Sequence, residues 1–232
     1  MPAPRAQLLP TYADLYPHRR SPTSKVLLSV KDPHAVLQRD VESTGLRRLA
    51  EARSSPEKDI VLISTNKGSI QITANLVANL ASVGVHHYIV LASTPELCAS
   101  VSGRIACVWS TLLDPYLERL RNVVPGPALL YRLWLLRQIY AGRLASMGFN
   151  PFMLDSDSIV FHDPFKVIAE HLPGFQLYVM GDNSGTHSSI NCGTYYLRGL
   201  DPRGKLLVAW TNVRRLVSIL WVTARLASHR SC

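Results

Sequence analysis

Short apolar segments alternate with helical patterns along the first half of the chain, and this alternation constrains the fold most strongly. Compact apolar segments at Asp59–Ser64 and His86–Leu91 have the length and composition of buried parallel strands. Between them, Ile70–Val83 places apolar residues at helical spacing. A shorter helix, Pro95–Ser100, leads to a third strand at Arg104–Trp109. This order predicts a doubly wound, mostly parallel α/β sheet with helices on both faces.

The second half of the chain extends this order. Ala128–Met147 predicts a long helix that is apolar nearly all round, so most of it is expected to pack against the sheet. Gly148 ends this helix. Three strands and one helix are expected after it, at Phe152–Leu154, Pro164–His171 (the helix), Phe175–Met180 and Ile190–Leu197.

The ends of the chain complete the predicted organisation. Residues 1–24 are rich in proline and predict an irregular leader, while residues 25–232 are expected to form a single domain. Asp32-Pro33 has the form of an N-cap followed by proline at the first helical position, and apolar spacing continues this helix through about residue 52. Leu206–Leu226 predicts an amphipathic helix.

Two carboxylates follow the predicted strand Phe152–Leu154 directly, in the sequence Asp155-Ser156-Asp157. Residues i and i+2 of a strand point to the same side, so both carboxylates are expected to face one ligand. Hard oxygen ligands suit Mg²⁺ or Mn²⁺, and such an ion is often shared with the diphosphate of a substrate. The alternative is a solvated acidic turn, because a bare Asp-x-Asp pattern is common.

Other polar residues are expected near these carboxylates. Ligands of doubly wound sheets bind beyond the carboxyl ends of the strands, and the turn Thr65–Gly68 lies at such an end. Arg132 and Arg137 of the long helix are candidates to reach an anionic ligand there. The alternative for each arginine is a position on the rim of the helix, facing water or a carboxylate.

The net charge of +9 does not predict a nucleic-acid partner. Residues 59–200 contain nine Lys or Arg and nine Asp or Glu, so the excess positive charge lies in the two ends of the chain. No basic run exceeds two residues, and no stripe combines aromatic with basic residues. We therefore expect no nucleic acid among the partners.

The four cysteines contain no Cys-x-x-Cys pattern, which argues against a zinc site. We expect ordinary buried thiols for most of them, while a pair between Cys98 and Cys107 stays open in an oxidising compartment. The sequence also leads us to expect no signal peptide and no transmembrane segment, because the apolar stretch Leu216–Ala224 is too short to cross a bilayer.

The segment Gly148–Asp157, followed by Asp163-Pro164, resembles the nucleotide-diphospho-sugar transferase domain of plant and algal glycosyltransferases. This group is related to the rhamnogalacturonan xylosyltransferases and to arabinosyltransferases. Gly181-Asp182-Asn183 and Asn191–Tyr196 match the family as well, and Ile70–Val83, with its Asn79, is similar to the family's opening unit. The resemblance extends roughly from Asp59 to Trp210.

This resemblance implies a GT-A-like fold and a metal-dependent glycosyltransferase. The donor would be a nucleoside-diphosphate sugar, expected to be a UDP-sugar, from which a pentose or hexose passes to a glycan or a hydroxylated protein with retained configuration. The family further implies Mn²⁺ or Mg²⁺ as the cofactor, and a place in the Golgi lumen, where cell-wall glycans are made.

The resemblance also implies roles for particular residues. Asp155 and Asp157 would hold the metal, with Asp155 near the ribose as well, while Thr65 and Asn66 would line the nucleotide pocket. The arginine candidates of the long helix would support the diphosphate.

Four further residues would shape the donor-sugar side of the site: Asp182, Asn183, Asn191 and Gly193. Asp182 is the candidate catalytic residue, as an electrostatic stabiliser of the oxocarbenium-like sugar. The alternatives are a turn-forming aspartate at Asp182 and, at Asn191, a side chain that bonds to the local backbone.

The C-terminal part of the chain departs from the family and keeps an alternative function open. Family members continue past the position of Trp210 with an Asp-Gln segment and often a late histidine. Here Leu206–Cys232 contains no Asp or Glu, and its single histidine is His229. The alternative is a catalytically weak or inactive sugar-nucleotide-binding homologue, or a fragment. A haloacid-dehalogenase-like phosphatase fits less well, since its paired aspartates follow the first strand.

Overall fold

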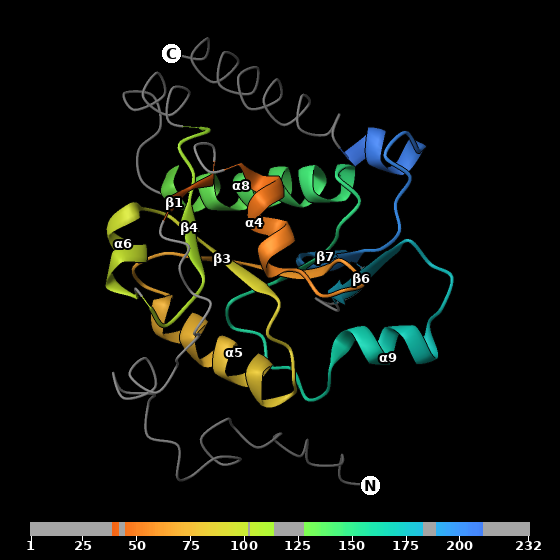
Figure 1. Cartoon of the computed structure of the whole chain (residues 1–232), viewed down its shortest axis with the longest axis horizontal. Helices are drawn as coiled ribbons and strands as arrows, with labels where there is room; N and C mark the ends of the chain where they lie inside the picture. The colour runs from red at the N-terminus through yellow and green to blue at the C-terminus, as the bar shows by residue number, and fades with distance from the viewer. Residues whose placement is uncertain (1–38, 42–44, 102, 114–127, 183–188, 211–232) are drawn as a thin grey trace, which may run out of the picture.

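A computed structural model shows a seven-stranded mixed sheet flanked by helices (Figure 1). The structure describes residues 39–41, 45–101, 103–113, 128–182 and 189–210. The strand order is β1-β4-β3-β2-β5-β7-β6, and all neighbouring pairs from β1 to β5 are parallel. β7 runs antiparallel to both of its neighbours. The mostly parallel α/β fold predicted from the sequence is confirmed, and it is consistent with a GT-A-like architecture.

The strands and helices of the first half lie close to the predicted bounds. They are β2 (Asp59–Thr65), α5 (Ile70–Ser82), β3 (Tyr88–Ala92), α6 (Pro95–Ser100) and β4 (Cys107–Trp109). The hydroxyl oxygen of Thr94 accepts a hydrogen bond from the amide of Leu97, which caps α6 as its sequence indicates.

The second half of the chain contributes two helices and three strands. They are α8 (Ala128–Ser146), β5 (Asn150–Leu154), α9 (Pro164–His171), β6 (Leu177–Asp182) and β7 (Ser189–Leu197). The Asp163 side chain caps α9 by accepting from the amides of Phe165 and Lys166. Residues 205–210 are helical, as predicted, and the rest of the predicted C-terminal helix lies outside the described residues.

The helix predicted from Asp32 to about residue 52 is wrong at Arg39 and Asp40, and its residues 32–38 lie outside the described residues. A short strand, β1 (Arg39–Asp40), pairs with Val108 and Trp109 of β4, and the helix α4 spans only Leu46–Arg53. Gly45 precedes α4 with a positive φ of 87°, a conformation that interrupts a helix. Pairing with the edge of the sheet therefore overrides the helical spacing. The predicted leader lies outside the described residues.

Two apolar cores cover the two faces of the sheet, because side chains alternate along each strand. In β5, Phe152 and Leu154 belong to the core beneath α5, α6 and α9, whereas Met153 belongs to the core beneath α4 and α8. Figure 1 shows α4 and α8 on one side of the sheet and α5 and α9 on the other. The prediction of helices on both faces is confirmed.

The arrangement of the strands brings the predicted site to one edge of the sheet. β2 and β5 are neighbouring parallel strands. Thr65, at the end of β2, and Asp155, directly after β5, therefore lie at the same carboxyl ends of the strands. β7 runs in the opposite direction and therefore begins at that edge, close to where β6 ends at Asp182. Among the described residues, no helix is long and apolar enough to span a membrane.

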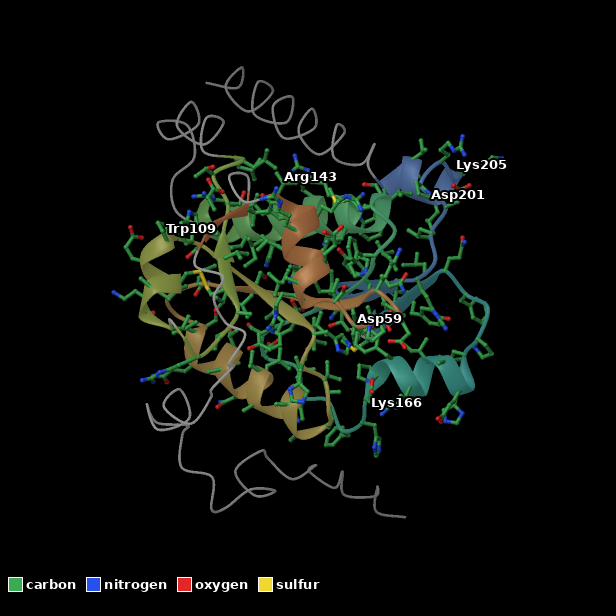
Figure 2. The ribbon with its side chains drawn as sticks, viewed as in Figure 1. Asp59, Trp109, Arg143, Lys166, Asp201 and Lys205 are labelled. Carbon is green, nitrogen blue, oxygen red and sulfur yellow. A yellow bond between two sulfur atoms is a disulfide. The ribbon has the colours of Figure 1, made fainter. Side chains whose placement is uncertain are left out.

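The opposite edge of the sheet contains a buried carboxylate, Asp59, labelled in Figure 2. Its Oδ1 accepts hydrogen bonds from the Tyr196 hydroxyl at 2.6 Å and from Asn150 Nδ2 at 3.0 Å. Burial raises the pKa of Tyr196, and the bond to Asp59 raises it further. The Tyr196 hydroxyl thus stays protonated and donates to the carboxylate, which ties β2 to β7 across β5.

His87 lies near the same edge and packs against the Phe165 ring, with 4.8 Å between the ring centroids. Its Nε2 is buried and has no hydrogen-bond partner. Burial lowers the pKa of His87 by disfavouring the imidazolium, while the negative charges of Asp59 and Asp163 act in the opposite direction.

Acid should therefore destabilise the fold through His87. Because the folded-state pKa lies below the unfolded value of about 6.5, this contribution is complete above that pH and is lost as the pH falls through the folded pKa. Urea unfolding between pH 8 and pH 5 should show a smaller loss of stability in His87→Gln than in the wild type. The exposed His162 provides the control, since His162→Gln should behave as the wild type does. Equal pH dependence in all three proteins would contradict the prediction.

A disulfide joins Cys98 of α6 to Cys107 of β4, with a Cα–Cα distance of 5.3 Å (yellow in Figure 2). The expectation of free thiols is therefore wrong for these two cysteines, and the pairing that the sequence left open is the one observed. Both residues are buried. Chain reversal after α6 brings the two positions together, which their separation of nine residues does not reveal.

Loss of this disulfide should lower the free energy of unfolding by about 2–3 kcal/mol, because it closes a short loop. A Cys98→Ala/Cys107→Ala variant should show this loss in urea, and reductant should destabilise the wild type but not the variant. Mass spectrometry after alkylation of the unreduced, unfolded chain supplies the direct check. Alkylation of both Cys98 and Cys107 in that experiment would show that they do not pair.

Candidate functional site

The two predicted carboxylates lie in a turn and not in a strand. β5 ends at Leu154, and the amide of Ser158 donates to the Asp155 carbonyl at 3.0 Å. The alternation expected from a continued strand therefore does not apply. The Asp155 side chain is 34% exposed, whereas Asp157 is an exposed residue. The structure gives the two carboxylates different surroundings.

Asp155 is held by an arginine from the long helix. Arg137 of α8 donates from Nη1 to Asp155 Oδ1 at 2.5 Å. Arg137 is buried, with only 6% of its surface exposed, and its Nε has no hydrogen-bond partner. Met153 of β5 belongs to the core beneath α8, and the contact with Arg137 places Asp155 against the same helix. The ion pair therefore fixes where this carboxylate lies.

Gly193 of β7 supports the same carboxylate from the other side. A Cβ atom at this position would overlap the Asp155 carboxyl group, including both of its oxygens. Only glycine leaves the room that the carboxylate occupies. Gly193, which the family resemblance assigned to the donor-sugar side, thus contacts Asp155 directly.

Asn191 shapes the backbone that presents Gly193. Its Oδ1 accepts from the amides of Gly193 at 2.7 Å and Thr194 at 3.2 Å. The pairing of β6 with β7 also shifts here, since Val179 pairs with Tyr195 but the next residue pairs with Asn191. The irregularity moves Gly193 out of the regular ladder. Asn191 therefore has the backbone-bonding role that the sequence left open as an alternative.

A network of small polar side chains follows β2. The Thr73 hydroxyl of α5 donates to Thr65 Oγ1 at 2.7 Å, and Thr65 also contacts the hydroxyl of Ser69 at 3.2 Å. Asn66 Oδ1 accepts from the amides of Gly68 and Ser69, at 2.8 and 3.1 Å. These bonds fix the turn between β2 and the start of α5.

A cavity of about 170 Å³ lies between this turn and the Arg137–Asp155 pair. It contains four of the predicted site residues: Thr65, Asn66, Arg137 and Asp155. The remaining lining residues are Ser64, Ser69, Leu133, Trp134 and Ser156, of which sequence reasoning missed all five. Two had detectable signals: Ser69 directly precedes the predicted helix, and Trp134 shares a helix face with Arg137 three residues later.

The other predicted residues lie outside this lining. Arg132 Nη2 donates to the Ser110 carbonyl at 2.7 Å, at the end of β4. The backbone of Asp182 ends β6 at the edge of the sheet where the cavity lies, but the structure does not describe its side chain. Asn183 lies outside the described residues.

Asn79 of α5 holds the chain that follows the acidic turn. Its Nδ2 donates to the Val160 carbonyl at 2.9 Å, and its Oδ1 accepts from the Val160 amide at 2.7 Å. These two hydrogen bonds satisfy the backbone amide and carbonyl of Val160, which a neighbouring strand would satisfy inside the sheet. The segment from Asp155 to Val160 is therefore anchored at both ends. Asn79 is among the residues that carry the family resemblance, but the resemblance assigned no role to it.

The protein side chains at the acidic turn can hold a divalent ion only if the substrate supplies further ligands to it. In the described part of the chain, no group of three His, Cys, Asp or Glu side chains could hold a metal. Asp155 and Asp157 provide two carboxylates, one of which is paired with Arg137. Mg²⁺ and Mn²⁺ are commonly held by one or two carboxylates together with substrate phosphates and water. The residues present fit that arrangement.

Residues 125–221 match the sequence model of a family described as nucleotide-diphospho-sugar transferase. The match spans less than half of the 232 residues. It contains Asp155 and the two residues that contact it, Arg137 and Gly193. Thr65 and Asn66 fall outside it, so the structure alone brings them to this segment. Comparisons with curated proteins and with solved structures give no match.

Substitution of Gly193 by alanine should displace Asp155. The added methyl group overlaps the carboxylate, so either β7 shifts or the Arg137–Asp155 pair separates, at a cost of about 1–3 kcal/mol in unfolding free energy. Urea unfolding measures this loss. Gly181→Ala in β6 is the matched control, because a Cβ there meets nothing within 4 Å. Equal stability of the two variants would contradict the contact between Gly193 and Asp155.

Proposed function

We propose that this protein is a glycosyltransferase that uses a nucleoside-diphosphate sugar as its donor. The observation that carries the proposal is that the matched family segment and the β2 turn meet at one cavity. This cavity lies at the edge of the sheet where α/β proteins bind ligands. It combines small hydroxyl and amide side chains with a buried arginine, which are the groups that bind ribose and phosphate.

The charges around the cavity support a donor that arrives together with a cation. Arg137 and Asp155 are the only charged residues among those that line it, and they pair with each other. These two side chains therefore provide little net positive charge to bind a diphosphate. The start of α5 adds only a partial positive charge at its amides. A bound divalent ion would supply the missing charge.

In this proposal, Asp157 is the principal metal ligand and Asp155 a secondary one. Asp157 is exposed, whereas Asp155 has one oxygen bonded to Arg137 and contacts Gly193. Mn²⁺ or Mg²⁺, when bound, would act as a Lewis acid that neutralises charge on the departing diphosphate. Arg137 would contribute hydrogen bonds to the same group through the part of its guanidinium that does not contact Asp155.

The reaction itself breaks the bond between the anomeric carbon of the sugar and the diphosphate oxygen, which keeps the electron pair. The oxygen of an acceptor hydroxyl forms the new bond to the anomeric carbon, and its proton passes to the departing diphosphate oxygen. Positive charge develops on the sugar ring meanwhile. We assign Asp182, at the end of β6, to the stabilisation of that charge, since its backbone lies at this edge of the sheet.

The finer assignment rests on the family resemblance. We propose UDP as the nucleotide, a pentose or hexose as the transferred group, and retention of configuration. The acceptor would be a glycan or hydroxylated protein, as for the xylosyltransferase and arabinosyltransferase group. The buried disulfide supports an oxidising compartment such as the Golgi lumen.

A sugar-nucleotide-binding homologue without transferase activity is the second candidate. It is favoured by one observation, namely that the described residues provide no third protein side chain for a metal at the acidic turn. Both candidates bind the nucleotide. Release of UDP from a UDP-sugar in the presence of Mn²⁺ separates them, because only the transferase cleaves the donor.

Calorimetric titration of UDP tests the proposal directly. Wild-type protein should bind UDP more tightly with Mn²⁺ than without it, and Asp157→Asn should remove most of that difference. Arg137→Met should weaken UDP by about 10- to 100-fold with or without Mn²⁺, since it loses charged hydrogen bonds. Glu170→Gln on α9, an exposed carboxylate away from the cavity lining, should match the wild type.

Two results would overturn the proposal. The first is an absence of UDP binding by the folded wild type in Mn²⁺. The second is equal affinity of the wild type and an Asp155→Asn/Asp157→Asn double variant, which would remove the acidic turn from the site.

A further inference from the structure

The cavity has one aromatic wall that the proposed function does not yet use. Trp134 lines it and is 45% exposed, although its neighbours Leu133 and Arg137 on α8 are buried. Leaving nearly half of an indole in water forgoes a large part of its hydrophobic stabilisation. A large exposed aromatic residue within a cavity is therefore a candidate for contact with a ligand.

Helix geometry places Trp134 about one turn closer to the N-terminus of α8 than the ion pair. It precedes Arg137 by three residues, so the two side chains lie on the same face of α8. α8 reverses through a short connection into β5, so its N-terminal half lies toward the carboxyl ends of the parallel strands. Side chains of a helix also lean toward its N-terminus. Trp134 thus lies farther than Arg137 toward the carboxyl ends of the strands.

Another part of the cavity lining is polar. It is formed by Thr65, Asn66 and Ser69, at the turn after β2. The cavity therefore has an aromatic wall, a hydrogen-bonding wall and an ion pair at Arg137 and Asp155. A nucleoside diphosphate has the same three parts: a base with a π face, a ribose with hydroxyl groups, and an anionic diphosphate. At about 170 Å³, the cavity suits part of such a ligand rather than all of it.

We propose that Trp134 is a nucleotide-binding residue on whose indole ring the nucleobase of the donor stacks. This inference rests on the proposed function and assigns the orientation of the donor. The base lies against α8 at Trp134, and the diphosphate lies toward Arg137 and the acidic turn. Stacking on an aromatic face tolerates any base, so the indole contributes affinity, and the Thr65–Asn66 turn provides the groups that can discriminate between bases.

The test compares UDP, uridine and inorganic diphosphate, each with Mn²⁺, on wild type, Trp134→Ala, Trp134→Leu and Trp134→Phe. Trp134→Ala should weaken UDP and uridine by about 5- to 150-fold, which is the range for loss of one base–aromatic stack. Inorganic diphosphate should bind unchanged. Trp134→Phe should recover most of the affinity, whereas Trp134→Leu, which keeps apolar bulk without an aromatic face, should not.

Tryptophan fluorescence provides a second readout. Uridine should quench part of the wild-type emission, and this quenching should disappear in Trp134→Phe while the other three tryptophans remain. Trp210, whose ring packs on Tyr195 and whose Nε1 donates to the Gln138 carbonyl, provides the matched control. Trp210→Phe should retain the quenching by uridine.

Each contrary outcome has a distinct meaning. If the wild type binds UDP and Trp134→Ala binds it equally well, stacking of the base is refuted and the proposed function stands. If Trp134→Ala loses inorganic diphosphate as strongly as UDP, the substitution damages the whole cavity, and the specific role of Trp134 is also refuted. If Trp134→Leu binds UDP as well as Trp134→Phe, the contact is apolar and not aromatic. If the wild type binds no UDP, the proposed function fails together with this inference.

Discussion

The ion pair between Arg137 and Asp155 is the interaction on which the candidate site depends. A buried guanidinium is costly without a partner, and Asp155 is the charged partner on the adjoining strand end. The pair connects the middle of α8 to the turn after β5, and Gly193 leaves space for the carboxylate on the far side. Three elements that are distant in sequence are thereby fixed around one carboxylate. The same pairing reduces the charge available to a ligand, and this is the physical reason why the proposed function adds a cation to an anionic donor.

Much of this arrangement follows from sequence pattern. The apolar segments of β2 and β5 and the helices between them indicate a parallel sheet, and a parallel sheet brings Thr65 and Asp155 to one edge. The strand assigned to the acidic residues was wrong for a local reason. Asp, Ser, Asp and Ser in succession all favour turns, since their side chains compete with the backbone for hydrogen bonds. If the segment is assigned as a turn on this basis, the sequence also predicts that the two carboxylates have different surroundings.

Contacts between distant segments could not be predicted in the same manner. Gly193 and Asp155 meet because β7 is irregular beside Asn191, and no spacing in the sequence reveals that shift of register. The disulfide likewise depends on how α6 returns to β4. At β1, a helical spacing of apolar residues competes with an open sheet edge, and pairing with β4 prevails at Arg39 and Asp40. In each case the tertiary partner decides the outcome, and its position is known only once the sheet is assembled.

The acidic turn is anchored unequally, and this has a consequence for binding. Asp155 is fixed by Arg137 and Gly193, and Val160 is fixed by both polar atoms of Asn79. Between these anchors, Asp157 lies exposed at the turn. A ligand that uses Asp155 meets a side chain whose conformational entropy is already lost on folding, whereas one that uses Asp157 must still order it. The fixed carboxylate therefore sets the position of the site, and the exposed one is the group able to adjust to what binds there.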